Sequence, residues 1–257
     1  MDNFNRQSKD KVSIILPIRR NENIRRVLES IHNSTYKNYE VLVIDEGLER
    51  SAQRNIGIKK ATGEYLLILD SDQYVTPNLL DECVRLCGGV VVNFLPGAIN
   101  YYYNNGVDAV YIPEVLKING FFSYIRNWER QFYTGTPIDV VRFVKAKDCP
   151  LFDETMSGPE DSAWDRQIKG CRAISRFPFI HNENVGIIGY FKKKHYYSKS
   201  MSLFAKKNPG DKVLNFYWRC FGVFLENGKW KRFLSRPDLA IAVLILILIR
   251  GIIYVSR

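Results

Sequence analysis

The amino-acid sequence predicts an α/β fold in which helices flank a mostly parallel sheet. Short apolar runs at 12–16, 41–44 and 65–69 have the length of buried strands. Segments with apolar residues at helical spacing lie between them, at 23–31 and 51–60. Because parallel strands are joined by a crossover connection that is usually helical, this alternation predicts a parallel sheet with crossover helices.

Local signals mark where these elements begin and end. Pro17 stops the first strand, Asn23 is a candidate N-cap of the first helix, and Ser51 caps the second, which residues 61–63 close. Further elements follow in chain order: a helix at 78–86, a strand at 90–95, a strand at 140–146, a helix at 162–169 and a return strand at 173–180. The Tyr-, Asn- and Phe-rich segment 96–135 predicts loop and short helix.

Composition narrows the class of protein. The chain has 257 residues, 46% hydrophobic and 25% charged, which is typical of a folded domain with a real core. Its formal net charge of +10 indicates anionic partners: nucleic acid, acidic lipid headgroups or phosphate-bearing ligands. The five cysteines form no C-x-x-C pair, and residues 1–11 lack the apolar core of a signal peptide. We therefore expect reduced thiols and a globular part that stays in the cytoplasm.

Two acids follow the third apolar run, and they are the first candidates for chemistry. Asp70 and Asp72 come directly after residues 65–69, where a buried strand ends. Ligands of open α/β sheets collect at the carboxyl ends of strands, and carboxylates there can hold a divalent cation with a phosphorylated ligand. The alternative is a turn in which Asp70 caps the helix that Pro77 begins.

The C-terminal part has a different character. From Ser198 onward, apolar residues alternate with Lys and Arg, which predicts amphipathic helices on a membrane surface with Trp218 and Trp230 at the headgroups. Two ordinary core-facing helices are the alternative. Residues 239–255 are apolar apart from Arg250 and would span about 25 Å as a helix, against about 30 Å for a bilayer core. We expect a transmembrane helix, or else a helix inserted in one leaflet, with the globular part cytoplasmic because basic residues precede it.

Five motifs resemble, in order and spacing, those of family-2 glycosyltransferases. They are V-S-I-I-L-P-I-R-R at 12–20, V-L-V-I-D-E-G at 41–47, A-Q-R-N-I-G-I-K-K-A-T-G-E-Y at 52–65, L-D-S-D at 69–72 and F-D-E-T-M-S-G-P-E-D at 152–161. The resemblance covers about 12–172 and implies the Rossmann-like GT-A fold of inverting enzymes. Together with the change of character at Ser198, it predicts a catalytic domain at 1–197, membrane-interface helices at 198–236 and a transmembrane helix at 237–257.

The resemblance implies roles for residues of the nucleotide-sugar site. Pro17, Arg19 and Asp45 would line the nucleotide pocket, with Asp45 accepting a hydrogen bond from the base. Arg54 would lie near the nucleotide, and Asp70 would contact the ribose or the sugar. For Asp45 a turn at the strand end is the alternative interpretation.

The resemblance also implies the catalytic and metal-binding residues. Asp72 would bind Mg²⁺ or Mn²⁺ on the diphosphate, His195 would meet the metal or the diphosphate, and Asp161 would be the general base. The chemistry of sugar transfer independently supports these roles. A cation stabilises the negative charge of the departing diphosphate, and a hydroxyl acceptor needs a base to take its proton. Helix capping is the alternative for Asp161, and a solvated position for His195. The chain departs from the family at Glu46, where a second aspartate is usual, at Gly47-Leu48, which replaces G-S, and at Gln73, where many members have another acid.

Together these observations predict a membrane-associated, metal-dependent, inverting hexosyltransferase. It would transfer a hexose, mannose from GDP-mannose being our first choice, from a nucleotide sugar to a lipid-linked or glycolipid acceptor held at a membrane. We expect no nucleic-acid partner. A polyprenyl-phosphate (dolichyl-phosphate) hexosyltransferase using UDP-glucose or GDP-mannose, a nucleotidyltransferase and a non-enzymatic membrane adaptor are the alternatives. The nucleotidyltransferase would need an early Gly-rich phosphate loop, which the sequence lacks.

Overall fold

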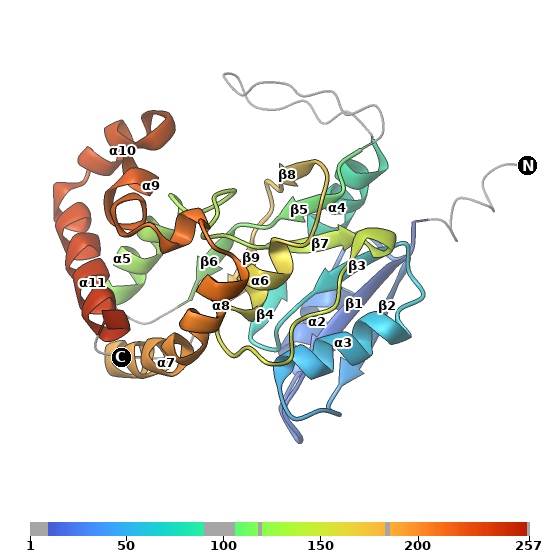
Figure 1. Cartoon of the computed structure of the whole chain (residues 1–257). Helices are drawn as coiled ribbons and strands as arrows, with labels where there is room; N and C mark the ends of the chain where they lie inside the picture. Colours follow the sequence, from blue (N-terminus) through green and yellow to red (C-terminus); the bar gives the residue numbers. More distant parts are fainter. Residues whose placement is uncertain (1–9, 90–105, 118–119, 183–185, 256–257) are drawn as a thin grey trace, which may run out of the picture. The chain divides into compact units, whose positions relative to one another are not determined.

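A computed structural model of the chain describes residues 10–89, 106–117, 120–182 and 186–255. The chain divides into two compact units (Figure 1). The first unit comprises residues 1–114, 141–152 and 164–181, and the second comprises residues 115–140, 153–163 and 182–257.

A six-stranded sheet forms the centre of the first unit. Its strands, in spatial order, are β2 (Tyr39–Ile44), β1 (Val12–Pro17), β3 (Tyr65–Ile68), β7 (Val141–Lys145), β5 (Ala109–Tyr111) and β8 (Arg172–Ile174). The pairs β1–β2, β1–β3 and β5–β8 are parallel, whereas β7 runs antiparallel to both of its neighbours. The mostly parallel sheet expected from the sequence is therefore confirmed.

Helices follow the first three strands, as the sequence pattern predicts. They are α2 (Arg25–His32), α3 (Arg50–Lys60) and α4 (Leu79–Gly88). Helix α3 packs on β1 and β2 (Figure 1). Gly57 permits this close approach, because a Cβ there would lie 2.4 Å from Cγ2 of Ile15. Alternate residues of β1 enter different buried clusters: Ile14 with Val27, and Ile15 with Leu66. The sheet is thus covered on both faces, which is why its strands read as continuous apolar runs.

A second, three-stranded sheet was not expected. Its order is β4 (Gln73–Val75), β9 (Phe179–His181), β6 (Glu114–Leu116). The return strand predicted at 173–180 is in fact two strands, β8 and β9, in different sheets. Between them, the backbone N–H of Arg176 and the hydroxyl of Ser175 donate to the buried carboxylate of Glu82, so the chain leaves the sheet there. The strand predicted at 90–95 lies outside the described residues.

The second unit is helical in the part of it that the structure describes, apart from the end of β6. Its helices are α5 (Phe121–Arg130), α7 (Ile187–Tyr197), α8 (Met201–Lys207), α9 (Val223–Leu225), α10 (Trp230–Leu234) and α11 (Pro237–Val255), with short 3₁₀ and π turns between them. Helix α6 (Glu160–Asp165) begins in this unit. The core is aromatic: Phe132 and Phe233 pack edge to face with centroids 5.6 Å apart, and Phe224 lies 4.7 Å from Phe233.

The structure corrects the expectation for residues 198–236. Instead of long amphipathic helices, this segment forms several helices and turns of three to seven residues. Trp218 is buried in the core, and its indole N–H donates to Glu226 at 2.9 Å. It therefore does not present its ring to lipid headgroups, whereas Trp230 is 47% exposed.

The segment expected as a transmembrane helix, 237–257, contains helix α11 (Pro237–Val255). Helix α11 does form, but no helix in the described part of the chain is long and apolar enough to cross a membrane. One side of α11, including Val243 and Leu246, is buried in the core of the second unit. Arg250 on the same helix pairs with Glu129 of α5 at 2.6 Å. One face of α11 therefore packs in the unit, and the buried apolar residues of that face serve this packing.

Candidate active site

The carboxyl ends of three neighbouring strands bring together most of the residues that the sequence singled out. Strands β1 and β2 end side by side at Pro17 and Ile44, and the N–H of Leu69, just after β3, bonds to the carbonyl of Ile15 at 3.1 Å. Arg19, Asp45, Asp70 and Asp72 follow these strand ends. Because parallel strands place their carboxyl ends at one edge of a sheet, these residues lie at the edge where ligands of such sheets bind.

Asp70 is held by three guanidinium groups. Arg54 Nη2 lies 2.8 Å from its Oδ1, and nitrogens of Arg50 and Arg142 both lie 3.9 Å from its Oδ2. Burial by itself would raise the pKa of Asp70, but the three cations hold that pKa well below its ordinary value. The carboxylate is therefore ionised, and its negative charge fixes the loop that follows β3.

The alternative in which Asp70 caps the next helix is wrong. The N-cap of α4 is Asn78, and no side chain caps that helix. Asp70 instead receives its bonds from Arg54, whose side chain is fully buried and lies 5.0 Å from the ring centroid of Phe152. Asn55 of the same helix also exchanges two hydrogen bonds with the backbone of Phe152. Helix α3 thus holds two loops of the first unit in place at once.

Asp72 has a partner that the sequence interpretation missed. Its side chain is 46% exposed, and its Oδ2 lies 3.3 Å from Nε2 of His181. The other ring nitrogen of His181 lies 3.4 Å from Glu114, which accepts a hydrogen bond from Gln73 at 3.0 Å. The small second sheet builds this group, because Gln73 and His181 are register partners on β4 and β9. The only signal in the sequence was the position of His181, at the end of an expected strand.

A second missed residue, Glu22, links two loops of the site. One of its carboxylate oxygens accepts from the N–H of Arg19 at 2.8 Å, and the other from the hydroxyl of Ser71 at 2.7 Å. The loop after β1 and the loop after β3 are therefore joined. Asp45 is exposed to solvent, and its neighbour Glu46 pairs with Lys60 at 2.6 Å.

The remaining two predicted residues belong to the second unit. Asp161 lies in the first turn of α6, and His195 lies in the last turn of α7, where its side chain is exposed. The structure thus brings Asp72 to His181 within the first unit. The roles expected for Asp161 and His195 stay predictions.

Asp72 and His181 supply two side chains of the kinds that bind divalent cations. Among the described residues, no group of three or more His, Cys, Asp or Glu side chains could hold a metal ion. A carboxylate and an imidazole, as offered by Asp72 and His181, are ligands that Mn²⁺ accepts, and such ions commonly take their other ligands from phosphates and water. Nε2 of His181 is buried, makes no hydrogen bond of good geometry and lies 3.3 Å from Oδ2 of Asp72.

Comparison with known proteins gives one family. The family described as "Glycosyl transferase family 2" matches residues 46–139. The chain is 25% identical to glycosyltransferase GlyA of Streptococcus pneumoniae over 42% of this chain and 19% of that protein. It is 33% identical to an uncharacterized glycosyltransferase of Rickettsia felis over 58% of this chain and 26% of that protein. The chain thus covers about a quarter or less of these two curated relatives.

Two solved structures share the fold. The mannosyltransferase PcManGT from Pyrobaculum calidifontis, in complex with GDP-Man and Mn²⁺, has a TM-score of 0.55 and 15% identity, over 95% of this chain and 86% of that chain. S. aureus TarS 1–349, in complex with UDP-GlcNAc, has a TM-score of 0.51 and 15% identity, over 93% of this chain and 81% of that chain. These likenesses show an α/β fold of the GT-A type.

Proposed function

We propose, on the premise that this chain belongs to glycosyltransferase family 2, that it transfers a hexose from a nucleotide sugar with the help of a divalent cation at Asp72. One observation carries the proposal: a half-exposed carboxylate and an imidazole nitrogen stand 3.3 Å apart at the carboxyl edge of a parallel sheet. Two ligands from the protein leave coordination positions for the oxygens of a diphosphate.

The residues of the first unit would prepare the site for charge that develops as the sugar leaves. Asp72 and His181 would hold Mn²⁺ or Mg²⁺, which when bound stabilises the negative charge on the nucleoside diphosphate. Asp70 and its three arginines would keep the loop after β3 rigid, so that Asp72 is positioned before the donor arrives. Preorganised groups of this kind need no rearrangement during the reaction.

Asp161 would act as the general base of an inverting transfer. The acceptor oxygen forms a bond to the anomeric carbon while the bond from that carbon to the diphosphate breaks, and the hydroxyl proton passes to Asp161. We expect Asp161→Asn to lose at least a hundredfold in transfer rate while nucleotide affinity stays the same. Transfer at an undiminished rate in this variant would rule out the role as base.

The donor and the acceptor are further parts of the proposal. GDP-mannose is our first choice of donor, and the GDP-Man bound to PcManGT supports testing it first. The UDP-GlcNAc bound to TarS is the reason to test UDP sugars beside it. For the acceptor we propose a lipid-linked or glycolipid hydroxyl at a membrane surface, supported by the net charge of +10.

Calorimetry with nucleoside diphosphates tests the proposal directly. GDP and UDP are titrated into the full chain with Mn²⁺ and with a chelator, for the wild type, Asp72→Ala and Glu64→Ala. Glu64 is an exposed acid just before β3 and serves as the matched control. We expect binding of at least one nucleotide to need Mn²⁺ and to weaken at least tenfold in Asp72→Ala alone. Equal binding in the chelator would contradict the proposal.

A further inference from the structure

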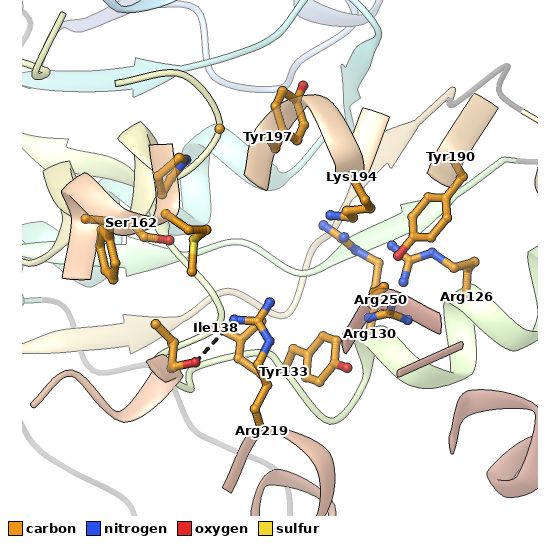
Figure 2. A pocket seen from close by; sticks show the side chains of 15 residues that line it. Arg126, Arg130, Tyr133, Ile138, Ser162, Tyr190, Lys194, Tyr197, Arg219 and Arg250 are labelled. Carbon is orange, nitrogen blue, oxygen red and sulfur yellow. Dashed lines mark hydrogen bonds between the residues drawn. The ribbon is translucent and has the colours of Figure 1, made fainter. Parts of the chain in front are cut away.

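The second unit contains a cavity of about 210 Å³ that is strongly cationic. Five basic side chains line it: Arg126, Arg130, Lys194, Arg219 and Arg250. They come from α5, α7, η4 (Trp218–Gly222) and α11. Figure 2 shows Lys194, Arg126 and Arg250 directed at the same space. The cavity is smaller than the about 300–1,000 Å³ that encloses a drug-sized ligand, so it suits a single charged group.

Two of the five cations that line this cavity share a single carboxylate. None of the described residues that line it is acidic. Glu129, behind the wall, pairs with both Arg126 and Arg250. Burial, and then the neighbouring Arg126, Arg250 and Arg219, lower the pKa of Lys194 well below its ordinary value. Gathering like charges away from water costs free energy, which a bound anion would offset.

The arginines retain hydrogen-bonding capacity for such an anion. The Nε atoms of Arg126 and Arg250 are buried and donate to no described group. Guanidinium groups bind phosphate oxygens with paired N–H donors, and a lysine adds a point charge. The side chain of Arg126 is itself 6% exposed, so it is held in a built site and does not move freely in solvent.

A second cavity, of about 170 Å³, adjoins the first and is mostly apolar. The two share five lining residues: Tyr133, Met201, Val213, Arg219 and Arg250. Leu214, Phe216, Ile247 and Gly251 complete the wall of the second cavity, together with Cys220. A ligand that filled both cavities would have an anionic head joined to an apolar chain.

The cationic cavity also adjoins the segment that carries the expected base. Pro159 and Ser162 line the cavity, and they flank Glu160 and Asp161 in the sequence. A ligand anchored here by its charged head would therefore have its neighbouring group next to the first turn of α6.

We propose that these two cavities bind the phosphate and the first part of the hydrocarbon chain of a lipid-linked phosphate, which is the acceptor side of the reaction. The role of these cavities as an acceptor site rests on the proposed function. The binding of a lipid phosphate by their side chains does not. The phosphate is recognised by Arg126, Lys194 and Arg219, and the hydrocarbon chain by the apolar wall around Gly251. The acceptor hydroxyl is carried by the group attached to the phosphate.

Binding of farnesyl phosphate, farnesol and inorganic phosphate to the full chain tests this, in a chelator and without nucleotide. We expect farnesyl phosphate to bind at least tenfold more tightly than either of the other two. Lys194→Gln and Arg219→Gln should each weaken binding of both phosphate compounds about tenfold. Lys192→Gln, an exposed lysine on the same helix, is the matched control and should change neither affinity.

A fourth variant tests the apolar part by itself. A Cβ at Gly251 would make an ordinary contact of 3.6 Å with Phe216, so Gly251→Leu fills the second cavity and suits a helix. It should weaken farnesyl phosphate about tenfold and leave inorganic phosphate unchanged. Unaltered affinity for farnesyl phosphate in Gly251→Leu, or equal affinity for inorganic phosphate in the wild type, would overturn the lipid assignment.

Unaltered binding in both Lys194→Gln and Arg219→Gln would overturn the phosphate assignment. Thermal unfolding of each variant separates lost binding from lost folding. Asp72→Ala separates this site from the donor site, because it should abolish metal-dependent nucleotide binding and leave farnesyl phosphate binding intact. The two proposals can therefore fail independently.

Discussion

At the scale of single residues, His181 gives the sharpest test of the metal site. We expect His181→Ala to weaken Mn²⁺-dependent nucleotide binding about tenfold, because it removes one of the two proposed metal ligands, the other being Asp72. Calorimetry at several Mn²⁺ concentrations measures this, and His32→Ala, at an exposed site on α2, is the control.

The same titration on His195→Ala tests whether His195 or His181 is the histidine that binds the metal ion. A larger loss of Mn²⁺ dependence there than in His181→Ala would favour the sequence-based expectation over the pair seen in the structure. Each substitution removes one imidazole, so the comparison is matched in chemistry.

Arg54 is the second residue whose effect can be predicted. Removing one partner of a buried ion pair leaves an uncompensated charge, which costs about 3–5 kcal/mol. Arg50 and Arg142 still compensate part of the charge of Asp70. Arg54→Met should therefore lower the free energy of unfolding by about 3 kcal/mol, the lower end of that range. Urea denaturation measures this. Arg50→Met is the control, because that side chain is 45% exposed and should change stability by less than about 1 kcal/mol.

At the scale of elements, one carboxylate joins α5 to α11. Glu129 on α5 is fully buried and accepts from Arg250 on α11, from Arg126 and from Tyr133. Burial alone would raise the pKa of Glu129, but Arg250 and Arg126 lower it from 4.5 to about 2. Folding thus stabilises the ionised carboxylate of Glu129 relative to its protonated form.

This shift predicts how the stability of the second unit depends on pH. Since the folded pKa lies below the unfolded one, the stabilisation is complete above about pH 4.5 and is lost as the pH falls toward 2. We expect the difference in unfolding free energy between wild type and Glu129→Gln to shrink by about 3 kcal/mol from pH 7 to pH 2. Denaturant titrations across this range measure it, and a difference that stayed constant would contradict the assignment.

At the scale of the whole molecule, the net charge and an exposed apolar stripe are the basis for a proposed contact with a membrane. The net charge is +10, and Ile241, Ile245, Leu248 and Ile252 of α11 are each more than half exposed. Their spacing places them on one face of that helix. We propose attachment to a membrane surface through this face.

Vesicle flotation tests the attachment. The chain should float with vesicles that contain anionic lipid, and less so at high salt, because counterions screen the attraction. Ile245→Gln combined with Leu248→Gln should reduce the bound fraction, whereas Lys192→Gln should have only a small effect. Equal flotation with neutral vesicles at any salt concentration would argue against an electrostatic contribution to membrane attachment.

Much of the first unit could be predicted because its signals are local. Strand runs such as 12–16 and 65–69 are apolar at every position except Ser13, since both faces of the sheet are covered, and the crossover helices show their own periodicity. The acids at 70 and 72 follow a strand end, so their place at the sheet edge could be inferred. The short strands β4, β5 and β6 have three residues each and too little pattern to be recognised.

The sequence by itself therefore determined the fold class and the edge of the sheet where the acids lie, because periodicity and strand ends depend on neighbouring residues. Only the tertiary structure decided that His181 meets Asp72, and that α11 packs in a core with Arg250 on Glu129. Glu129 and Arg250 are 121 residues apart, and such partners are chosen by how the elements pack. Apolar residues give the same pattern in a sequence whether lipid or a protein core covers them, and only the structure shows that Val243 and Leu246 of α11 lie in a core.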